Sequence, residues 1–268
     1  MKNNDIKKAM DKLSAISKHR SRPIEIIQDM TQGLFNILTT PQLVASAAPV
    51  SGFYYRPEFK TNPRDFHRQP EADKALFEAI TIWIRTIAEN EPFTDVMNEL
   101  FAPHLGESLG QFLTPPDLAA GLLPFLMGIN GPIVPPEDEI HIADPAGCGA
   151  GSLILGQLKY IYHDEGPEAL SRVHVTGVDL DPTMAMLTAV QIGMNVLIHG
   201  AQPASINIHC GNGITDYDDE IKGYGPKTLI YLWERIPKYT KSLSPQFNAC
   251  TEIMSRFKEE EGKLKKAA

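Results

Sequence analysis

The chain has few cysteines and no long apolar run. Three cysteines stand in 268 residues, at 148, 210 and 250, and none belongs to a CxxC pair. Their odd number and wide spacing argue against a disulfide framework and against a zinc site. The longest apolar runs, such as Leu118–Met127, are too short to span a bilayer, and Met1–Arg20 lacks the apolar core of a secretion signal. We therefore expect a cytoplasmic protein that makes no membrane contact and holds no metal.

An excess of positive charge is also lacking. The formal net charge is −8, which argues against a protein that binds nucleic acid through bulk charge. Two stretches, Tyr54–Lys60 and Arg64–Arg68, nevertheless interleave aromatic and basic residues. They suit either base stacking beside a phosphate backbone or a surface loop pinned to the core by its aromatics. Because Glu58 and Asp65 dilute the charge, we favour the loop. With Lys222–Lys241, these stretches predict only weak DNA binding by the chain alone.

The first 105 residues show helical periodicity and no strand alternation. Four stretches carry apolar residues at helical spacing: Ile6–Lys18, 22–38, Ala72–Glu89 and Val96–Phe101. Thr94 or Asp95 is the expected cap of the last one. We therefore predict a helical N-terminal region at residues 1–105, followed by an α/β domain at residues 106–268.

From Gly110 onward, short apolar strands alternate with helices. Strands are expected from Ile140 up to Asp144, at Val173–Val178, at Ser205–His209 and at Lys227–Trp233. The helices between them include one that begins near Pro116 and a long one that begins at Pro182 and stops at His199-Gly200. This alternation predicts a parallel sheet with helices on its faces.

The segment Ile140–Leu155, IHIADPAGCGAGSLIL, joins a strand to a helix through a glycine-rich turn. Gly147, Gly149 and Gly151 remove the Cβ atoms that would block a ligand, and the helix N-terminus supplies partial positive charge. Such turns also occur without a ligand, so the neighbouring segments decide the interpretation.

Three strand ends carry polar side chains: Asp144, Asp179 and Asn212. Ligands of open parallel sheets bind at the carboxyl ends of the strands. A carboxylate at Asp179 suits two ribose hydroxyls, and an amide at Asn212 suits an adenine edge. Asp181, directly before Pro182, is the better helix cap, so capping leaves Asp179 unexplained. The order of glycine turn, acid and amide therefore predicts a nucleoside site.

Four segments in order carry a resemblance to a known family: GQFLTPPDLAAGLL, DPAGCGAGSLIL, GVDLDPTMAMLTAVQIGMNVLIHG and CGN. They resemble motifs of the N6-adenine DNA methyltransferases, most closely the methylation subunit of type I restriction-modification systems. The resemblance covers about residues 75–215. It implies a Rossmann-like S-adenosylmethionine-dependent methyltransferase fold with an incomplete parallel sheet, and S-adenosyl-L-methionine as the cofactor.

The resemblance also implies roles for individual residues. Phe112, Thr114 and Pro115 would flank the methionine end of the cofactor. Asp144, Gly147, Gly149 and Gly151 would form its backbone cradle. Asp179 would hold the ribose, and Asn212 would lie near the adenine. The chain departs from the family pattern twice. In DPAGCGAG, one more residue separates Asp144 from the Gly-x-Gly than in the family's DPTCGSG. At the end of the third strand, Asn212 stands where the family more usually has Asp.

The family's catalytic motif is not found in the chain. In the resembling enzymes an Asn/Asp-Pro-Pro-Tyr/Phe motif follows the fourth strand, accepts the hydrogens of the adenine amine and stacks on the flipped base. The printed sequence contains no NPPF, NPPY or DPPY, and Lys227–Trp233 runs into Glu234-Arg235-Ile236-Pro237. Trp233 for stacking and Glu234 for accepting hydrogen bonds are the weak catalytic candidates.

Three functional hypotheses follow from the sequence. The first is an S-adenosylmethionine-binding, DNA adenine methyltransferase-like protein without transfer activity, which acts as a regulatory or interaction module linked to DNA modification or mobile DNA. The second is an active N6-adenine DNA methyltransferase with an unconventional or partner-completed site. The third is a structural interaction protein with an empty cleft. Because no target-recognition region is visible, a protein partner is expected to supply DNA recognition.

Overall fold

The computed structural model describes residues 3–16, 22–39, 53–55, 59, 70–101, 113–130, 139–213 and 228–232. Its first part contains α1 (Asn3–Ile16), α2 (Pro23–Leu38), β1 (Phe53–Tyr55), α4 (Pro70–Glu89) and α5 (Asn98–Phe101). Its second part contains α6 (Pro116–Asn130), β2 (Ile140–Asp144), α7 (Ser152–Asp164), the 3-10 helix η5 (Pro167–Arg172), β3 (Val173–Asp179), α8 (Pro182–His199), β4 (Ser205–Cys210) and β5 (Thr228–Leu232). Each helix and strand that the sequence predicts among these residues is present, within a few residues of its predicted ends.

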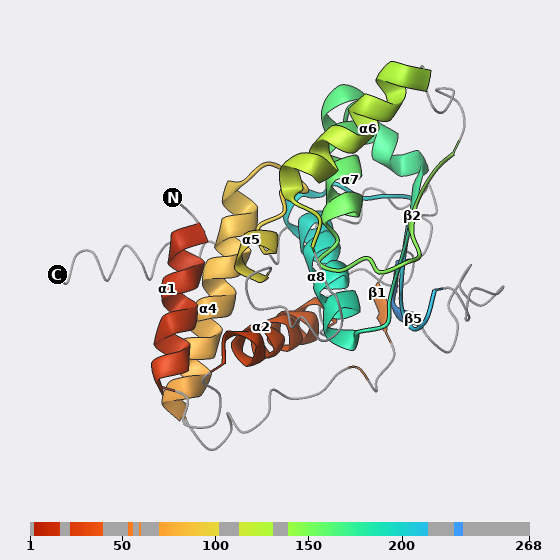
Figure 1. Ribbon diagram of the computed structural model, residues 1–268. Coiled ribbons are helices and arrows are strands. Elements are labelled where there is room, and N and C mark those ends of the chain that lie inside the picture. The colour runs from red at the N-terminus through yellow and green to blue at the C-terminus, as the bar shows by residue number, and fades with distance from the viewer. Residues whose placement is uncertain are drawn as a thin grey trace.

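The described strands form one sheet in the order β1-β5-β4-β3-β2. β2, β3 and β4 are parallel, with Asp144 opposite Gly177 and Asp179 opposite Cys210. α7 and α8 lie on one side of these strands, and α2 and α4 lie beyond α8 (Figure 1). The fold is therefore an incomplete Rossmann-like α/β sheet in which the carboxyl ends of three parallel strands meet at one edge.

The predicted parallel sheet is confirmed for β2, β3 and β4, but the expectation that the fourth strand, β5, belongs to it as a parallel strand is wrong. β5 runs antiparallel to β4, and β1 runs antiparallel to β5. Thr228 pairs with His209 and Leu232 with Ile206, so β5 ends beside the amino ends of the parallel strands. Strand periodicity does not depend on strand direction, and an antiparallel neighbour needs no crossover connection. The sequence pattern alone therefore did not determine the direction of β5.

The expectation of no strand before residue 105 is also wrong, because Phe53–Tyr55 forms β1. Three residues are too few for alternation to be recognised in a sequence. Of the rest of the Tyr54–Lys60 stretch, the structure describes Phe59, which packs against the core and whose carbonyl oxygen accepts a hydrogen bond from Gln32 Nε2 at 3.0 Å. Arg64–Arg68 lies outside the described residues.

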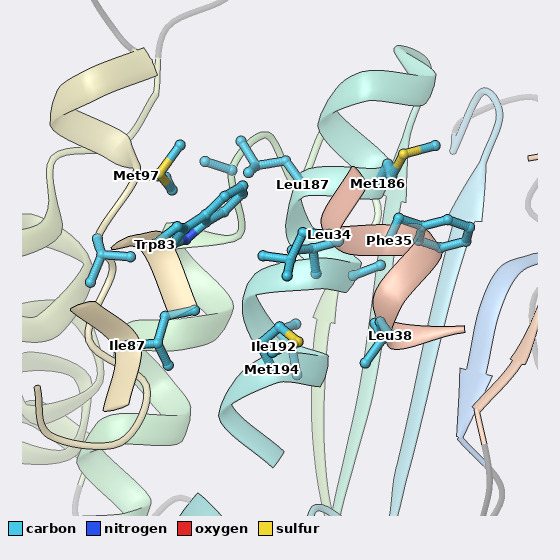
Figure 2. Close-up of a cluster of buried hydrophobic side chains, with 14 of the residues drawn as sticks. Leu34, Phe35, Leu38, Trp83, Ile87, Met97, Met186, Leu187, Ile192 and Met194 are labelled. Carbon is cyan, nitrogen blue, oxygen red and sulfur yellow. The ribbon is translucent and has the colours of Figure 1, made fainter. Parts of the chain in front are cut away.

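Helix α8 is the centre of the core. All its residues from Met184 to Leu197 are buried, as expected for a helix with apolar side chains all round. Figure 2 shows Leu34 of α2 and Trp83 of α4 facing the α8 residues Leu187 and Ile192. The predicted ends of this helix are confirmed. The Asp181 carboxylate accepts a hydrogen bond from Thr183 N at 2.8 Å, and Gly200 ends the helix at φ 66°.

The buried core includes residues on both sides of residue 105. Leu34 and Trp83 before it belong to the same cluster as Ile154 and Leu187 after it. The boundary between residues 105 and 106 stays a prediction, but the two predicted regions pack on each other. Within the described part of the chain, no helix combines the length and apolarity needed to cross a membrane.

Two helical glycines provide a matched test of the packing of α6 on α7. A Cβ at Gly156 would lie 2.7 Å from the carbonyl oxygen of Ala119, whereas a Cβ at Gly121 would have no atom within 4 Å. Gly156→Ala is expected to lower the free energy of unfolding by about 1–3 kcal/mol, because the obstacle is backbone. Gly121→Ala is expected to raise it by up to about 1 kcal/mol through helix propensity. Urea denaturation measures both, and equal effects would contradict the packing.

Candidate cofactor site

The glycine turn connects the end of β2 to the start of α7. Gly147, Gly149 and Gly151 have φ angles of 129°, 56° and 86°, in the region that favours glycine. Cys148 N donates to the carbonyl oxygen of Val178 at 2.9 Å, so the turn is fixed to the end of β3. A Cβ at Gly149 would lie 2.9 Å from Leu113 Cδ2. The turn is therefore held rigidly, and a side chain at Gly149 would run into Leu113 across the space beside it.

The Asp179 carboxylate links the turn to the edge of the sheet. Gly149 N donates to Asp179 Oδ2 and Asp181 N donates to Asp179 Oδ1, both at 2.8 Å. Gly211 N donates to the main-chain carbonyl of Asp179 at 2.8 Å, which adds the turn after β4 to the same assembly. A carboxylate has about four acceptor sites, so Asp179 keeps acceptor capacity beyond these bonds.

Two carboxylates share this edge, and burial raises the pKa of both. For Asp144 the loss of solvent is the main cause; the Ala146 amide opposes it, and the charge of Asp179 adds to it. For Asp179 the main cause is again burial, opposed by backbone hydrogen bonds from Asp181 and Gly149. Burial also raises the pKa of the buried Cys148 thiol, so this thiol is protonated at neutral pH. The edge is acidic and suits a ligand with hydroxyl or cationic groups.

A cavity of about 110 Å³ lies between the turn and the segment before α6. Its lining residues are Leu113, Thr114, Asp144, Ala146, Gly147, Cys148, Gly149, Ala150, Ser152 and Leu153. Pockets for small molecules usually measure roughly 300–1,000 Å³. The described cavity therefore accounts for part of a cofactor site.

The structure brings most of the predicted site residues to one place. Thr114, Asp144, Gly147 and Gly149 line the cavity, whereas Asp179 holds the turn and is absent from the lining. Gly151 is the N-cap of α7, and Pro115 is exposed next to Thr114.

Asn212 lies on the turn after β4, at the same edge of the sheet. The next residue, Gly213, is so close to the glycine turn that a Cβ there would lie 1.6 Å from the carbonyl oxygen of Pro145. Asn212 is therefore near the start of the turn, and its role at the adenine stays a prediction.

Three predicted residues, Phe112, Trp233 and Glu234, lie outside the described residues. The strand that precedes Trp233 in the chain ends at Leu232, opposite Ile206. That position is at the amino ends of the parallel strands, whereas the cavity is at their carboxyl ends.

Sequence reasoning missed Leu180, which directly follows Asp179. Its side chain is 69 % exposed, although it is large and apolar. Its position is the one sequence signal that could have identified it, because it stands between Asp179 and Asp181 at the end of a buried strand. It offers an apolar surface beside the carboxylates.

Sequence reasoning also missed a polar network behind the cavity. Thr94 or Asp95 was predicted as a helix cap, and Asp95 does accept hydrogen bonds from Met97 N and Asn98 N. It also accepts one from Ser152 Oγ at 2.6 Å, across 57 positions of sequence. The capping pattern around Asp95 was the one available signal, and it says nothing about a contact so distant in the chain.

A glycine turn between a parallel strand and a helix, with acids at two adjacent strand ends, is the place where open Rossmann-like α/β sheets bind nucleotide ligands. The chain matches the family model of the N-6 DNA methylases over residues 94–227, which is half of its length. It belongs to the N-6 DNA methylase family. The family implies S-adenosyl-L-methionine as the cofactor.

Among solved structures, the chain is similar to one described as a class I S-adenosylmethionine-dependent methyltransferase from Listeria monocytogenes. The two share 13% sequence identity with a TM-score of 0.44, over 80% of this chain and 55% of the other. The chain thus spans about half the length of that protein. No curated protein matches the chain.

The raised pKa of Asp179 predicts a specific pH dependence. Between the ordinary carboxyl value near pH 4 and the raised pKa, the native state binds more protons than the unfolded state. The free energy of unfolding should therefore fall as the pH rises through this window. In Asp179→Asn this contribution disappears, so the difference between wild type and variant should change with pH from about 4 upward and become constant above the raised pKa. Urea denaturation from pH 4 to 7 measures it, and a constant difference throughout would contradict the burial of the charge.

Proposed function

We propose that this chain binds S-adenosyl-L-methionine at the carboxyl ends of β2, β3 and β4, and that it transfers no methyl group on its own. Its role is then that of a regulatory or interaction module linked to DNA modification or mobile DNA. The observation that supports binding best is the geometry of the glycine turn. Gly149 N of this turn donates a hydrogen bond to the Asp179 carboxylate, and the turn lines a cavity together with Asp144.

The residues present fit the cofactor chemically. Gly149 leaves free the space that a Cβ would fill, and the N-terminus of α7 favours an anionic group such as the methionine carboxylate. Asp144 suits the ammonium or sulfonium charge, Asp179 the ribose hydroxyls, and Leu180 the adenine face. When bound, the cofactor supplies an electrophilic methyl group on a sulfonium sulfur. The protein residues named here bind and orient it.

Two observations support the absence of transfer by this chain alone. The printed sequence contains no Asn/Asp-Pro-Pro-aromatic motif that would accept the amine hydrogens of adenine. In addition, β5 runs antiparallel to β4 and ends beside the amino ends of the parallel strands, at the edge of the sheet opposite the cavity.

Calorimetry with S-adenosyl-L-methionine tests the cofactor site. The wild-type chain is expected to bind, and Asp179→Ala to weaken binding more than about tenfold, because it removes a buried charged acceptor and the partner of Gly149 N. Gly149→Ala is expected to do the same by pushing against Leu113. Gly121→Ala, on the exposed side of α6, is the matched control and should bind like wild type. No heat at millimolar cofactor would contradict the proposal.

An active methyltransferase completed by a partner is the second candidate. It is favoured by the position of β2, which carries Asp144 and is one of the two edge strands of the described sheet. Edge strands present unpaired backbone groups to which another strand can add. A parallel strand from a partner at this edge would place its carboxyl end beside Asp144. That partner would also supply DNA recognition.

A tritiated-methyl transfer assay on mixed-sequence DNA distinguishes the two candidates. The chain alone is expected to give no incorporation. Incorporation by the chain alone that Asp179→Ala abolishes would overturn the first candidate, and incorporation only with a co-purified partner would establish the second. If Asp179→Ala and Gly149→Ala lose cofactor but keep all partner binding, the interaction role does not depend on the cofactor.

A further inference from the structure

We propose that Asp95 and Asn98 are positioning residues that hold the two walls of the cofactor cavity at a fixed separation. The walls are the segment Leu113–Thr114 and the glycine turn with the first residue of α7. This inference rests on the proposed S-adenosyl-L-methionine site, because it assigns to that site the residues that keep it open.

Asn98 bridges the two walls directly. Its Nδ2 donates to the carbonyl oxygen of Thr114 and to Ser152 Oγ, both at 2.7 Å. Thr114 lines the cavity from one side and Ser152 from the other. An amide nitrogen carries two hydrogens in one plane, so these two bonds determine the direction of both partners at once. The side chain is 4 % exposed, which makes both bonds costly to lose.

Asp95 holds this bridge in place from behind. Its Oδ2 accepts the hydrogen of Ser152 Oγ at 2.6 Å, which leaves the Ser152 oxygen to accept from Asn98. Its Oδ1 accepts from Asn98 N at 3.0 Å and from Gln191 Nε2 at 3.1 Å. The carboxylate therefore joins the start of α5, the start of α7 and the middle of α8.

Helix α8 completes the connection to the glycine turn. Gln191 Nε2 also donates to the carbonyl oxygen of Ala150 at 2.8 Å, and Thr188 Oγ1 donates to that of Gly149 at 2.8 Å. Two carbonyls of the turn thus point to α8. The position of the turn is therefore coupled to Asp95 through Gln191 as well as through Ser152.

The segment before Asp95 is held in an unfavourable backbone conformation. Phe93 has φ 61°, and it is the one non-glycine residue with positive φ among the residues that the structure describes. Its N–H donates to Asn195 Oδ1 at 2.7 Å, and its ring meets Tyr162 edge to face at 6.4 Å. Such conformations persist where the surroundings over-determine them. The contacts of Phe93 therefore fix the backbone direction of the segment that leads to Asp95.

This arrangement makes the cavity depend on residues that do not contact the proposed ligand. Removal of the Asn98 amide would release Thr114 from Ser152 without changing any lining side chain. The expected consequence is local loosening of both walls and weaker cofactor binding. A purely structural role for Asn98 would instead loosen the whole core.

The test uses the full chain with Asn98→Ala, Ser152→Ala and the double variant, and Ile87→Val as a matched control. Ile87 is buried on α4 and does not line the cavity, so its truncation is expected to loosen the core without removing a lining side chain. Hydrogen exchange without ligand is followed in peptides that cover residues 113–116 and 147–153, and calorimetry measures the Kd of S-adenosyl-L-methionine.

Asn98→Ala is expected to accelerate exchange in both walls more than elsewhere and to raise the Kd about tenfold. Ile87→Val should leave the Kd within about twofold. Because Asn98 and Ser152 act as one bridge, the double variant should bind about as weakly as the weaker single variant.

Exchange that rises uniformly in Asn98→Ala, as in Ile87→Val, would overturn the positioning role. An unchanged Kd beside loosened walls would also overturn it. If wild type binds no S-adenosyl-L-methionine, the proposed function fails. The exchange pattern without ligand then still decides whether Asn98 joins the two walls.

Discussion

The hydrogen bond from Gly149 N to the Asp179 carboxylate is the interaction on which the site depends. It joins the glycine turn after β2 to the end of the neighbouring strand β3. Two carbonyl oxygens of the same turn, those of Gly149 and Ala150, accept hydrogen bonds from Thr188 and Gln191 of α8. The turn is therefore hydrogen-bonded both to the end of β3 and to α8. Burial of the carboxylate makes this bond stronger than an exposed one and makes its loss expensive. The turn is therefore rigid before any ligand arrives.

Much of this structure can be predicted from local patterns. The spacing of apolar residues located α1, α2, α4 and α8, and the Asp181-Pro182 and His199-Gly200 pairs located the ends of α8. These signals succeed because capping and periodicity act within one turn of helix. The strand ends at Asp144 and Asp179 were likewise predicted, since a buried strand followed by an acid and a turn residue is a local pattern.

Apart from the three-residue strand β1, the features that could not be predicted depend on distant contacts. The direction of β5 depends on which edge of the sheet its chain reaches, and periodicity does not encode that. The bridge of Asn98 between Thr114 and Ser152 joins three segments that are far apart in sequence. The second role of Asp179 was missed for the same reason. Its strand-end position suggested a ligand, but only the structure shows that its carboxylate also holds Gly149.

The two carboxylates at the edge serve different purposes because their surroundings differ. Asp144 lines the cavity, so its charge acts on whatever enters. Asp179 holds backbone amides, so its charge mainly stabilises the shape of the turn. A ligand that also binds Asp179 would therefore share a carboxylate that already accepts hydrogen bonds from Gly149 N of the glycine turn and from Asp181 N. Binding at this acid would then be coupled to the position of the turn, and through Gln191 to the N-terminal segment that contains Asp95. The segment that contains Asp95 and the start of α5 is in this sense part of the candidate site, although it is far from the glycine turn in sequence.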